Sequence, residues 1–337
     1  MWVLTDTNVV SMFKRLTSKQ ILSYQKTLLD GLKEYKNNPL LIPTRIVSPT
    51  SYCTHIFMAS TGTHVGMKAI STSSKFGMKG ITTILEKENG YPIGIINSTT
   101  LTAFRTALCN TLPLMKFYPI EENYNNDKII TFGVGDQAKW HIWLALKLYP
   151  KRFSKVLIVN RTILKAENLC KEFRKDFPNI EFNSLSLKDT NSLKNEIKDT
   201  SVIFSCVPTT EPTVTKKLID NCNNRCFISA IGSYKPHMIE IEGKLLKENI
   251  IKNNGKIIVD SIDHCLHEAG ELIINNINKE HLIDVATLYT SSNSKFLENS
   301  KFAVSKLVGL CIMDVWVGTK CLEEAKKQGL GIEIKDF

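Results

Sequence analysis

The sequence predicts an α/β protein with one domain built on a parallel sheet and a second domain of the α+β class. From residue 128 onward, short apolar runs alternate with amphipathic segments, a pattern typical of strands joined by helical crossovers. A glycine-rich turn at residues 133–138 directly follows the first of these apolar runs. Residues 45–97 instead contain short extended segments separated by Pro, Gly and Ser, which indicates a different kind of sheet.

Before residue 120 the pattern predicts two helices with strands between them. We expect a helix over 18–36, ended by Asn37-Asn38-Pro39, because its apolar residues recur with a helical period. A second helix is expected over 100–118, entered through Ser98-Thr99 and kinked or divided by Pro113. The expected strands cover residues 45–47, 54–59, 66–72, 81–85 and 93–96, and the last two form a hairpin with an Asn89-Gly90 turn.

The polar segment 121–127 is the clearest linker, and the alternating pattern begins after it. The expected strands are residues 128–132, 156–159, 181–187, 202–206, 226–230 and 256–259. Helices are expected over 137–148 and 163–173. Residues 305–327 are predicted to form a long apolar helix that returns to the first domain, since the alternating unit is complete without it.

Length and composition indicate a two-domain protein of the cytoplasm. The chain has 337 residues, 43% of them hydrophobic and 23% charged, which is typical of globular proteins. No apolar run approaches the roughly 20 residues that span a bilayer, and residues 1–10 lack the apolar core of a secretory signal. The nine cysteines are scattered and form no Cys-x-x-Cys motif, so we expect reduced thiols rather than disulfides.

The net charge of +10 indicates an anionic partner. Lysines are spread along the whole chain, whereas a nucleic-acid-binding protein would gather them in one footprint. We therefore expect an anionic substrate and cofactor, and no nucleic acid.

The segment Gly133-Val134-Gly135-Asp136-Gln137-Ala138 predicts a dinucleotide-binding loop. The first glycine permits a tight turn from strand to helix, and the second lets the backbone approach a pyrophosphate at the helix N-terminus. Ala138 takes the place of a third glycine and is still small enough for the helix to pack on the strand. Because the motif lies between a predicted strand and a predicted helix, it predicts a Rossmann domain.

The end of the second strand, Asn160-Arg161-Thr162, favours NADPH as the cofactor, although NADH remains possible. An NAD-selective site usually has an acidic residue here to bind the ribose hydroxyls. Asn160 and Arg161 instead offer donors and a cation, which a 2′-phosphate requires.

Several further motifs, in order along the chain, resemble those of the ornithine cyclodeaminase/mu-crystallin family. The resemblance covers nearly the whole sequence, and the ordered set is specific although each motif alone is not. The motifs are Pro43-Thr44-Arg45, Phe57-Met58, Gly66-Met67-Lys68, residues 101–107 (Leu-Thr-Ala-Phe-Arg-Thr-Ala), the Gly133 loop, residues 230–236 (Ala-Ile-Gly-Ser-Tyr-Lys-Pro), Val259-Asp260-Ser261, residues 268–272 (Glu-Ala-Gly-Glu-Leu) and residues 304–310.

The resemblance implies a homodimer with a substrate-binding and dimerisation domain built from both chain ends, residues 1–124 and 301–337, around a Rossmann domain at 125–300. It implies a small amino or imino acid as substrate, whose carboxylate lies among Arg45, Lys68 and Arg105. Lys68 and Arg105 are the residues expected to take part in catalysis. A guanidinium fork can fix a planar carboxylate in one orientation.

The resemblance also places further residues in the cofactor site. We expect the positions that follow two later strands, Cys206-Val207 and Ile231-Gly232, to line it. Lys306 matches a family lysine on the nicotinamide side, whereas Leu307 replaces the usual serine.

One departure from the family pattern bears on the reaction. Cyclodeaminases have an aspartate shortly after the glycine of the block at 230–236, but Gly232-Ser233-Tyr234-Lys235-Pro236 contains no carboxylate. Mu-crystallin, a ketimine reductase, also lacks it. The leading interpretation is therefore an NAD(P)H-dependent reductase of ketimine or cyclic imino acid carboxylates. An ornithine cyclodeaminase with a displaced acid, and a non-catalytic protein that binds NADPH and a small ligand, remain as alternatives.

Three other features carry less weight. The spacing of His264, Cys265 and His267, with Glu268, matches no familiar zinc site, so no metal is expected. We expect His141, in the first Rossmann helix, to be packed or hydrogen-bonded. Tyr234 could either donate a proton or form an aromatic wall.

Overall fold

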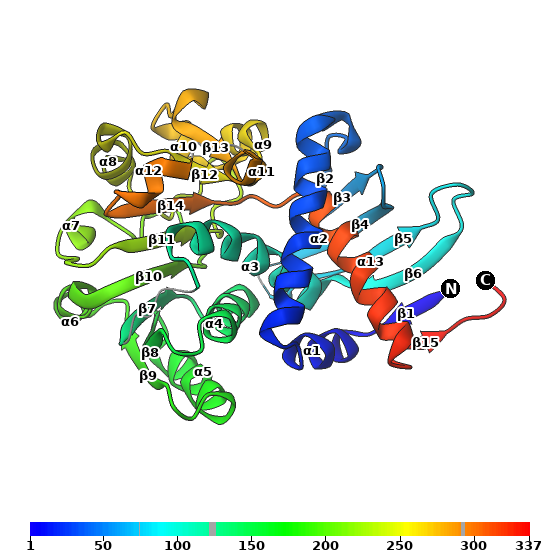
Figure 1. The fold of residues 1–337 in the computed structure, drawn as a ribbon, viewed down its shortest axis with the longest axis horizontal. Helices are drawn as coiled ribbons and strands as arrows, with labels where there is room; N and C mark the ends of the chain where they lie inside the picture. Colours follow the sequence, from blue (N-terminus) through cyan, green and yellow to red (C-terminus); the bar gives the residue numbers. More distant parts are fainter. Residues whose placement is uncertain (74, 121–125, 291–293) are drawn as a thin grey trace. The chain divides into compact units, whose positions relative to one another are not determined.

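The computed structural model describes residues 1–73, 75–120, 126–290 and 294–337, which form two compact units. The first unit comprises Met1–Cys109 and Gly309–Phe337, and the second comprises Asn110–Val308. Both chain ends therefore lie in the first unit (Figure 1), where the amino group of Met1 donates to the carbonyl of Ile334 at 2.8 Å. The predicted linker lies mostly at 121–125, outside the described residues.

The second unit is built on a parallel sheet, as predicted. Its described strands are β7 (Asp127–Phe132), β8 (Phe153–Asn160), β9 (Glu181–Ser186), β10 (Thr200–Ser205), β11 (Cys226–Ala230), β12 (Ile257–Val259), β13 (Leu282–Asp284) and β14 (Phe302–Lys306). They run in the order β13-β12-β14-β11-β10-β7-β8-β9, and every neighbouring pair is parallel. Strands such as β10 and β11 are buried along their whole length, which explains why apolar residues occupy consecutive positions at 202–204 and 226–228.

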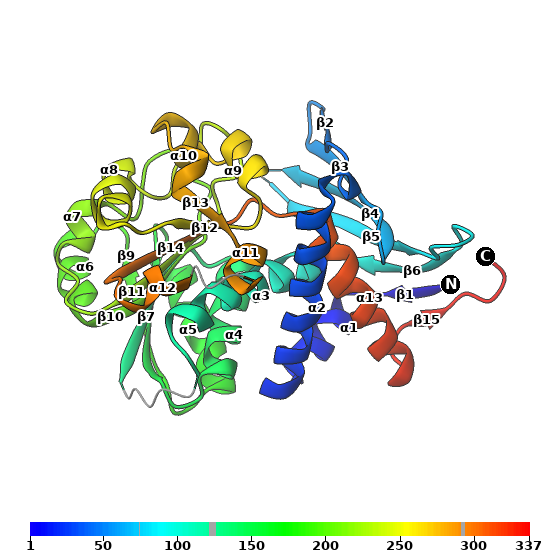
Figure 2. The ribbon, with the colours of Figure 1, turned by 45° about the horizontal axis from the view of Figure 1, so that its top comes forward.

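Helices accompany the strands of this unit, as Figure 2 shows from a second direction. α4 packs on β7 and β10, and α5 packs on β8 and β9. The described helices are α4 (Asp136–Leu148), α5 (Ile163–Asp176), α6 (Thr190–Glu196), α7 (Lys216–Ile219), α8 (Gly243–Leu245), α9 (Ile262–Glu268), α10 (Gly270–Ile274), α11 (Val285–Thr290) and α12 (Lys295–Glu298).

The first unit contains a mixed sheet in the order β15-β1-β6-β5-β4-β3-β2. Its strands are β1 (Trp2–Leu4), β2 (Ile46–Pro49), β3 (Thr54–Ser60), β4 (Val65–Ser73), β5 (Gly77–Leu85), β6 (Pro92–Asn97) and β15 (Ile332–Glu333). β2 to β6 form an antiparallel meander, whereas β1 pairs with β6 in parallel. The predicted β5–β6 hairpin is present, with residues 86–91 as its connection rather than a tight Asn-Gly turn.

Helices α1 (Asp6–Lys14), α2 (Ser18–Asn37) and α13 (Cys311–Lys327) belong to the first unit. α13 packs against α2 and against β3, β4 and β5 (Figure 1). α1 and α2 both begin with a threonine capping box, at Thr5 and Thr17. α3 (Ser98–Phe117) starts in the first unit and ends in the second.

Three expectations about local structure need correction. Residues 302–306 form β14 rather than the start of a helix, and α13 begins only at Cys311, after Gly309 takes a φ of +88°. The predicted boundary at 300/301 therefore assigns to the substrate domain a strand that pairs with β11 and β12 of the parallel sheet. α3 is not divided at Pro113, the second of the two outcomes predicted for that residue. Its first amides are bonded by Asn97 and Asp6, which accept from Thr99 and Thr100, rather than by Ser98 or Thr99 side chains.

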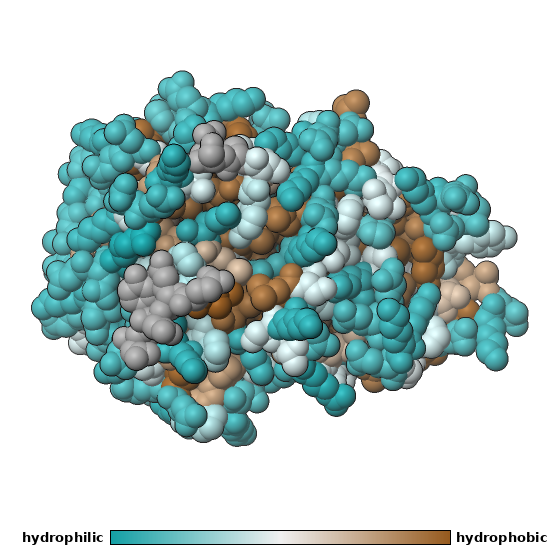
Figure 3. All heavy atoms as spheres, in the orientation of Figure 1, coloured by the Kyte–Doolittle hydropathy of each residue, from teal (hydrophilic) through white to brown (hydrophobic). Residues whose placement is uncertain are grey.

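On the face shown in Figure 3, hydrophilic residues predominate and hydrophobic ones form separate patches. None of the helices in the described ranges is long and apolar enough to cross a membrane.

Candidate active site

The glycine loop lies at the carboxyl end of β7, as predicted. The N–H of Gly133 donates to the carbonyl of Val159 at 2.9 Å, so the loop leaves the sheet beside β8. Gly133 has a φ of +102°, and a Cβ there would lie 2.8 Å from the carbonyl oxygen of Cys206. This position therefore needs glycine both for its backbone conformation and for its contact with the end of β10.

Gly135 has a different environment. It is the exposed N-cap of α4, and an added Cβ would meet no atom within 4 Å. Having no side chain, it supplies no hydrogen bond to the first amides of α4, which begins with Asp136, Gln137 and the fully buried Ala138. Open space in front of an uncapped helix N-terminus is suited to a pyrophosphate, so these residues are compatible with a bound dinucleotide.

The end of β8 presents polar groups and a cation. Asn160 Nδ2 donates to the carbonyl of Thr162 at 2.9 Å, which shapes the turn into α5. Arg161 and Thr162 are exposed, so the guanidinium is available to a ligand. This geometry is compatible with a 2′-phosphate contact.

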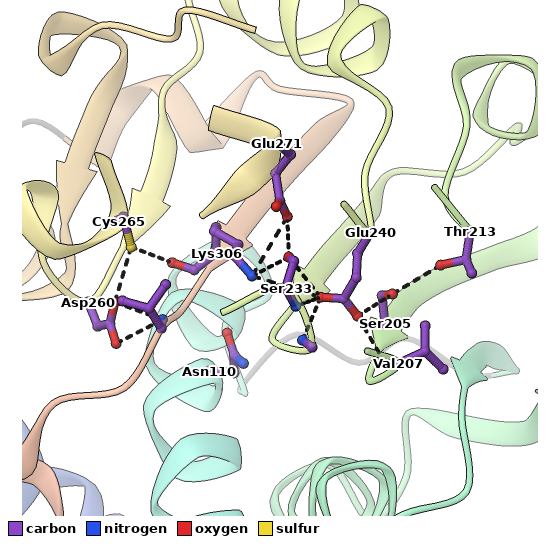
Figure 4. A network of polar contacts seen from close by, with 12 residues as sticks. Asn110, Ser205, Val207, Thr213, Ser233, Glu240, Asp260, Cys265, Glu271 and Lys306 are labelled. Carbon is purple, nitrogen blue, oxygen red and sulfur yellow. Dashed lines mark hydrogen bonds and ion pairs between the residues drawn. The ribbon is translucent and has the colours of Figure 1, made fainter. Parts of the chain in front are cut away.

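The ends of β10 and β11 are joined by a buried carboxylate. Glu240 Oε1 accepts from Ser205 Oγ at 2.7 Å and from the Val207 amide at 3.0 Å, while Oε2 accepts from the amides of Gly232 at 2.5 Å and Ser233 at 3.0 Å (Figure 4). Burial raises the pKa of the Glu240 carboxyl, and the Lys306 charge lowers it. The backbone amides of Val207 and Gly232, two of the predicted cofactor-lining positions, therefore donate to Glu240.

Lys306 is also engaged inside the second unit. Its ammonium donates to Ser233 Oγ at 2.6 Å and lies 3.8 Å from Glu240 and 3.7 Å from Glu271 (Figure 4). Ser233 Oγ in turn donates to Glu271 Oε1 at 2.7 Å. Lys306 is almost fully buried, so these contacts fix β14 against the ends of neighbouring segments. Its contact with a cofactor stays a prediction, as does that of Cys206 and Ile231.

His141 is buried and hydrogen-bonded, as expected. Its Nδ1 donates to the carbonyl of Gln137 at 2.7 Å, so Nε2 accepts from Asn110 Nδ2 at 2.9 Å. Asn110 Oδ1 accepts from Ser305 Oγ at 2.7 Å. Burial lowers the pKa of His141 to about 4, which keeps the ring neutral in this tautomer. The chain of bonds connects the first turn of α4 with β14.

In the first unit, two of the predicted cations share one carboxylate. Lys68 Nζ and Arg105 Nε donate to Asp314 Oδ1 at 2.8 and 3.1 Å. Lys68 also donates to Thr102 Oγ1 at 2.7 Å. β4 places Lys68 on the face covered by α13, α3 carries Arg105, and α13 carries Asp314, so three elements meet here.

Arg45 lies beside the same group. Its Nη2 donates to the carbonyl of Gly309 at 2.9 Å, and a Cβ at Gly309 would lie 2.9 Å from Arg105 Nη2. Both guanidinium groups therefore meet this glycine, and the structure brings all three predicted cations together. Burial lowers the pKa of Lys68 to about 8. The negative charge of Asp314 opposes this shift, whereas the positive charge of Arg105 adds to it. Such a concentration of positive charge favours an anionic ligand.

The segment after β11 contains no carboxylate of its own, and the carboxylates near it come from other segments. The carboxylates that contact it, Glu240 and Glu271, are buried and accept from its backbone and from Ser233. Tyr234 is partly buried, and burial raises its pKa. Within the described ranges no three His, Cys, Asp or Glu side chains gather as a metal site.

Sequence reasoning missed the acids in both units. Asp314 is the single charged residue between 307 and 319. A lone acid in an apolar helix indicates a buried carboxylate with a partner, so this pattern could have identified it. Glu271 lies within a motif noted above, but Glu240 has no distinguishing context in the sequence.

Comparison with known proteins agrees with this description. The family model of shikimate/quinate 5-dehydrogenase matches residues 118–232, within the parallel-sheet region. An uncharacterized protein of Saccharomyces cerevisiae is 30% identical, covering 93% of this chain and 94% of the yeast protein. A Delta(1)-pyrroline-2-carboxylate reductase of Colwellia psychrerythraea is 20% identical over 72% of both chains.

Solved structures share the fold along the whole chain. The Delta(1)-pyrroline-2-carboxylate reductase of Thermococcus litoralis, in complex with NADH and L-proline, has a TM-score of 0.79 at 17% identity and covers 99% of this chain and 100% of its own. A probable ornithine cyclodeaminase from Bordetella pertussis has a TM-score of 0.78 at 15% identity with the same coverage. The NAD+-bound iminosuccinate reductase of Paracoccus denitrificans has 0.77 at 14%, covering 99% of both chains. The yeast protein shows that this chain and it belong to one family, and the solved structures show that the chain has the fold of ornithine cyclodeaminases and imine reductases.

Proposed function

We propose that this protein is an NADPH-dependent reductase of small cyclic or linear ketimine carboxylates. The observation that carries the proposal is the group of three cations in which Lys68 and Arg105 are buried and share the acid Asp314, with the half-buried Arg45 beside them. Burying several like charges is costly unless an anion completes the site. A substrate carboxylate supplies that anion, and relatives named as imine reductases share the fold.

In this proposal the second unit binds the cofactor and the first unit binds the substrate carboxylate. The cofactor, when bound, supplies a hydride to the carbon of the C=N bond. The N-terminus of α4 binds the pyrophosphate, and Arg161 with Asn160 and Thr162 binds the 2′-phosphate. The guanidinium groups of Arg45 and Arg105 orient the substrate carboxylate, so that the neighbouring carbon is fixed in one position.

Lys68 has a second role in this proposal. With a pKa of about 8, its ammonium is acidic enough to give up a proton near neutral pH, unlike an ordinary exposed lysine. It therefore adds positive charge beside the carboxylate, and its proton converts a neutral imine to the iminium before hydride transfer. Tyr234 is a poorer donor, because burial raises the pKa of its phenol.

The segment after β11 favours reduction over cyclodeamination. In the cyclodeaminases that the sequence resembles, an aspartate of this segment serves the hydrolytic loss of ammonia, and residues 232–236 contain no carboxylate. Glu240 does not replace it, since both of its oxygens already accept from amides of the protein.

We also propose a homodimer formed through the open face of the first unit's sheet. Ile46, Phe57, Ala69 and Ile81 form one cross-strand row, and Met67 lies on the same face. The large side chains of this face are 42–65% exposed, namely Ile46, Phe57, Met67 and Ile81. Lys68 lies on the opposite face of the sheet and is buried. A row of exposed apolar side chains is typical of a surface that binds a partner. One structural relative is described as an alanine dehydrogenase dimer.

Turnover by the purified protein tests the reaction. We expect NADPH oxidation with five- and six-membered cyclic ketimine carboxylates, and no proline from ornithine with catalytic NAD. Proline formation at an ordinary enzymatic rate would instead identify a cyclodeaminase. Cofactor binding with neither reaction would identify a binding protein.

A further inference from the structure

The two oxygens of Asp314 have different surroundings. Oδ1 accepts from both Lys68 and Arg105, whereas Oδ2 has no hydrogen-bond partner among the described residues. The side chain is 0% exposed. A buried carboxylate oxygen without a donor is costly, and such atoms are rare in folded proteins. This oxygen is therefore a candidate acceptor for a ligand.

The other polar groups around Lys68 are already used. Thr102 Oγ1 accepts from Lys68 and donates its own hydrogen to the carbonyl of Ser98 at 2.5 Å. Cys311 Sγ donates to the carbonyl of Met58 at 3.3 Å. Among the oxygens of the side chains that contact Lys68 and Arg105, Asp314 Oδ2 is thus the one without a donor in the described residues.

The charges of the group require such an acceptor if the ligand carries a positive nitrogen. Arg45, Lys68 and Arg105 with Asp314 have a formal charge of +2. A protonated imine lies one carbon away from the substrate carboxylate, so it would be repelled by the same cations. A carboxylate oxygen facing the nitrogen changes that repulsion into a charge-assisted hydrogen bond.

We propose that Asp314 Oδ2 accepts the N–H of the protonated imine and so selects 2-imino carboxylates over 2-oxo acids and simple carboxylates. This inference rests on the proposed function. Lys68 and Arg105 then have a second effect, because their bonds to Oδ1 orient the carboxylate and leave Oδ2 for the substrate.

Two ligands of nearly the same shape test the inference without turnover. L-Proline carries a ring nitrogen where cyclopentanecarboxylate carries a methylene, and both carry the carboxylate. In calorimetric titrations with saturating NADP+, the wild-type protein should bind L-proline at least tenfold more tightly, which corresponds to about 1.4 kcal/mol. Asp314→Asn turns an N–H towards the ligand, so it should abolish this preference while cyclopentanecarboxylate binding stays within about threefold.

Glu324→Gln is the matched control. Glu324 is an acid on the same helix that accepts from Tyr24 Oη at 2.9 Å, remote in sequence from the cation group. This variant should keep the wild-type preference. Melting temperatures of both variants show whether the first unit is folded.

The outcomes separate the inference from the proposed function. If Asp314→Asn weakens both ligands by the same factor, Asp314 is only a counter-ion and the inference is wrong. If the variant does not fold, the wild-type ratio decides, because equal binding of the two ligands also overturns it. Imine turnover without a nitrogen preference overturns the inference alone. Absence of both turnover and ligand binding overturns the proposed function as well.

Discussion

Replacing Gly135 by alanine separates cofactor binding from folding. The residue has φ −78° and ψ −177°, which alanine adopts readily, and its added Cβ would meet no protein atom within 4 Å. We therefore expect the variant to fold normally. The same open space is where the pyrophosphate is proposed to approach the backbone, so the methyl group would displace it.

The expected magnitudes follow from these two environments. Folding changes little, because the gain of roughly 0.4–1 kcal/mol from a less flexible unfolded chain offsets the poorer N-cap. Displacing the pyrophosphate should remove at least one charge-assisted hydrogen bond of about 1.5–3 kcal/mol. NADPH affinity should then fall by about tenfold to over a hundredfold.

Gly133→Ala provides the contrast. Its φ of +102° and the 2.8 Å approach to the Cys206 carbonyl put strain into the folded protein itself. We expect this variant to lose roughly 1–3 kcal/mol of unfolding free energy. Denaturant titration and fluorescence titration with NADPH, performed on both variants, measure the two effects. A Gly135→Ala variant that binds NADPH as tightly as wild type would refute the assignment of the loop.

Four further predictions concern other groups of the two units. Arg161→Ala should weaken NADPH binding by about tenfold or more and leave NADH binding nearly unchanged, whereas equal wild-type affinities for the two cofactors would refute the 2′-phosphate contact. Arg105→Ala should lower kcat/KM for the substrate about tenfold to a hundredfold and leave NADPH affinity unchanged, and Arg105→Lys should restore little of the loss. Folded variants with wild-type kinetics would exclude Arg105 from the site. The protonated form of Lys68 is the competent one, so kcat/KM, corrected for substrate titration, should fall as pH rises through about 8, and Lys68→Met should lose this limb. Phe57→Glu should give a monomer in light scattering, while an unchanged dimer would place the interface elsewhere.

The parallel sheet could be predicted because its strands are buried on both faces and follow the glycine loop in regular order. The strand at residues 302–306 could not be predicted, since this short apolar run is compatible with either a strand or a helix. Pairing with β11 and β12 decides for the strand, and a single sequence does not contain that information.

The site shows the same limit more clearly. Lys68 and Arg105 could be proposed because each lies in a recognisable motif, but nothing nearby in the sequence indicates their common partner. Asp314 is 246 residues from Lys68 and 209 from Arg105. Such a contact depends on the packing of α13 on the sheet, which is a property of the assembled unit rather than of any one segment.

The carboxylate of Glu240 has a consequence for how this protein can change over evolution. Because it bonds Ser205, the Val207 amide and the amides after β11 at once, loss of the acid leaves several buried donors unsatisfied together. Changes at Ser205, Ser233 and Glu240 should therefore be non-additive, with coupling energies of roughly 0.5–3 kcal/mol between pairs. These positions would have to drift in concert, so a homologue that replaces one of them should carry a compensating change at another.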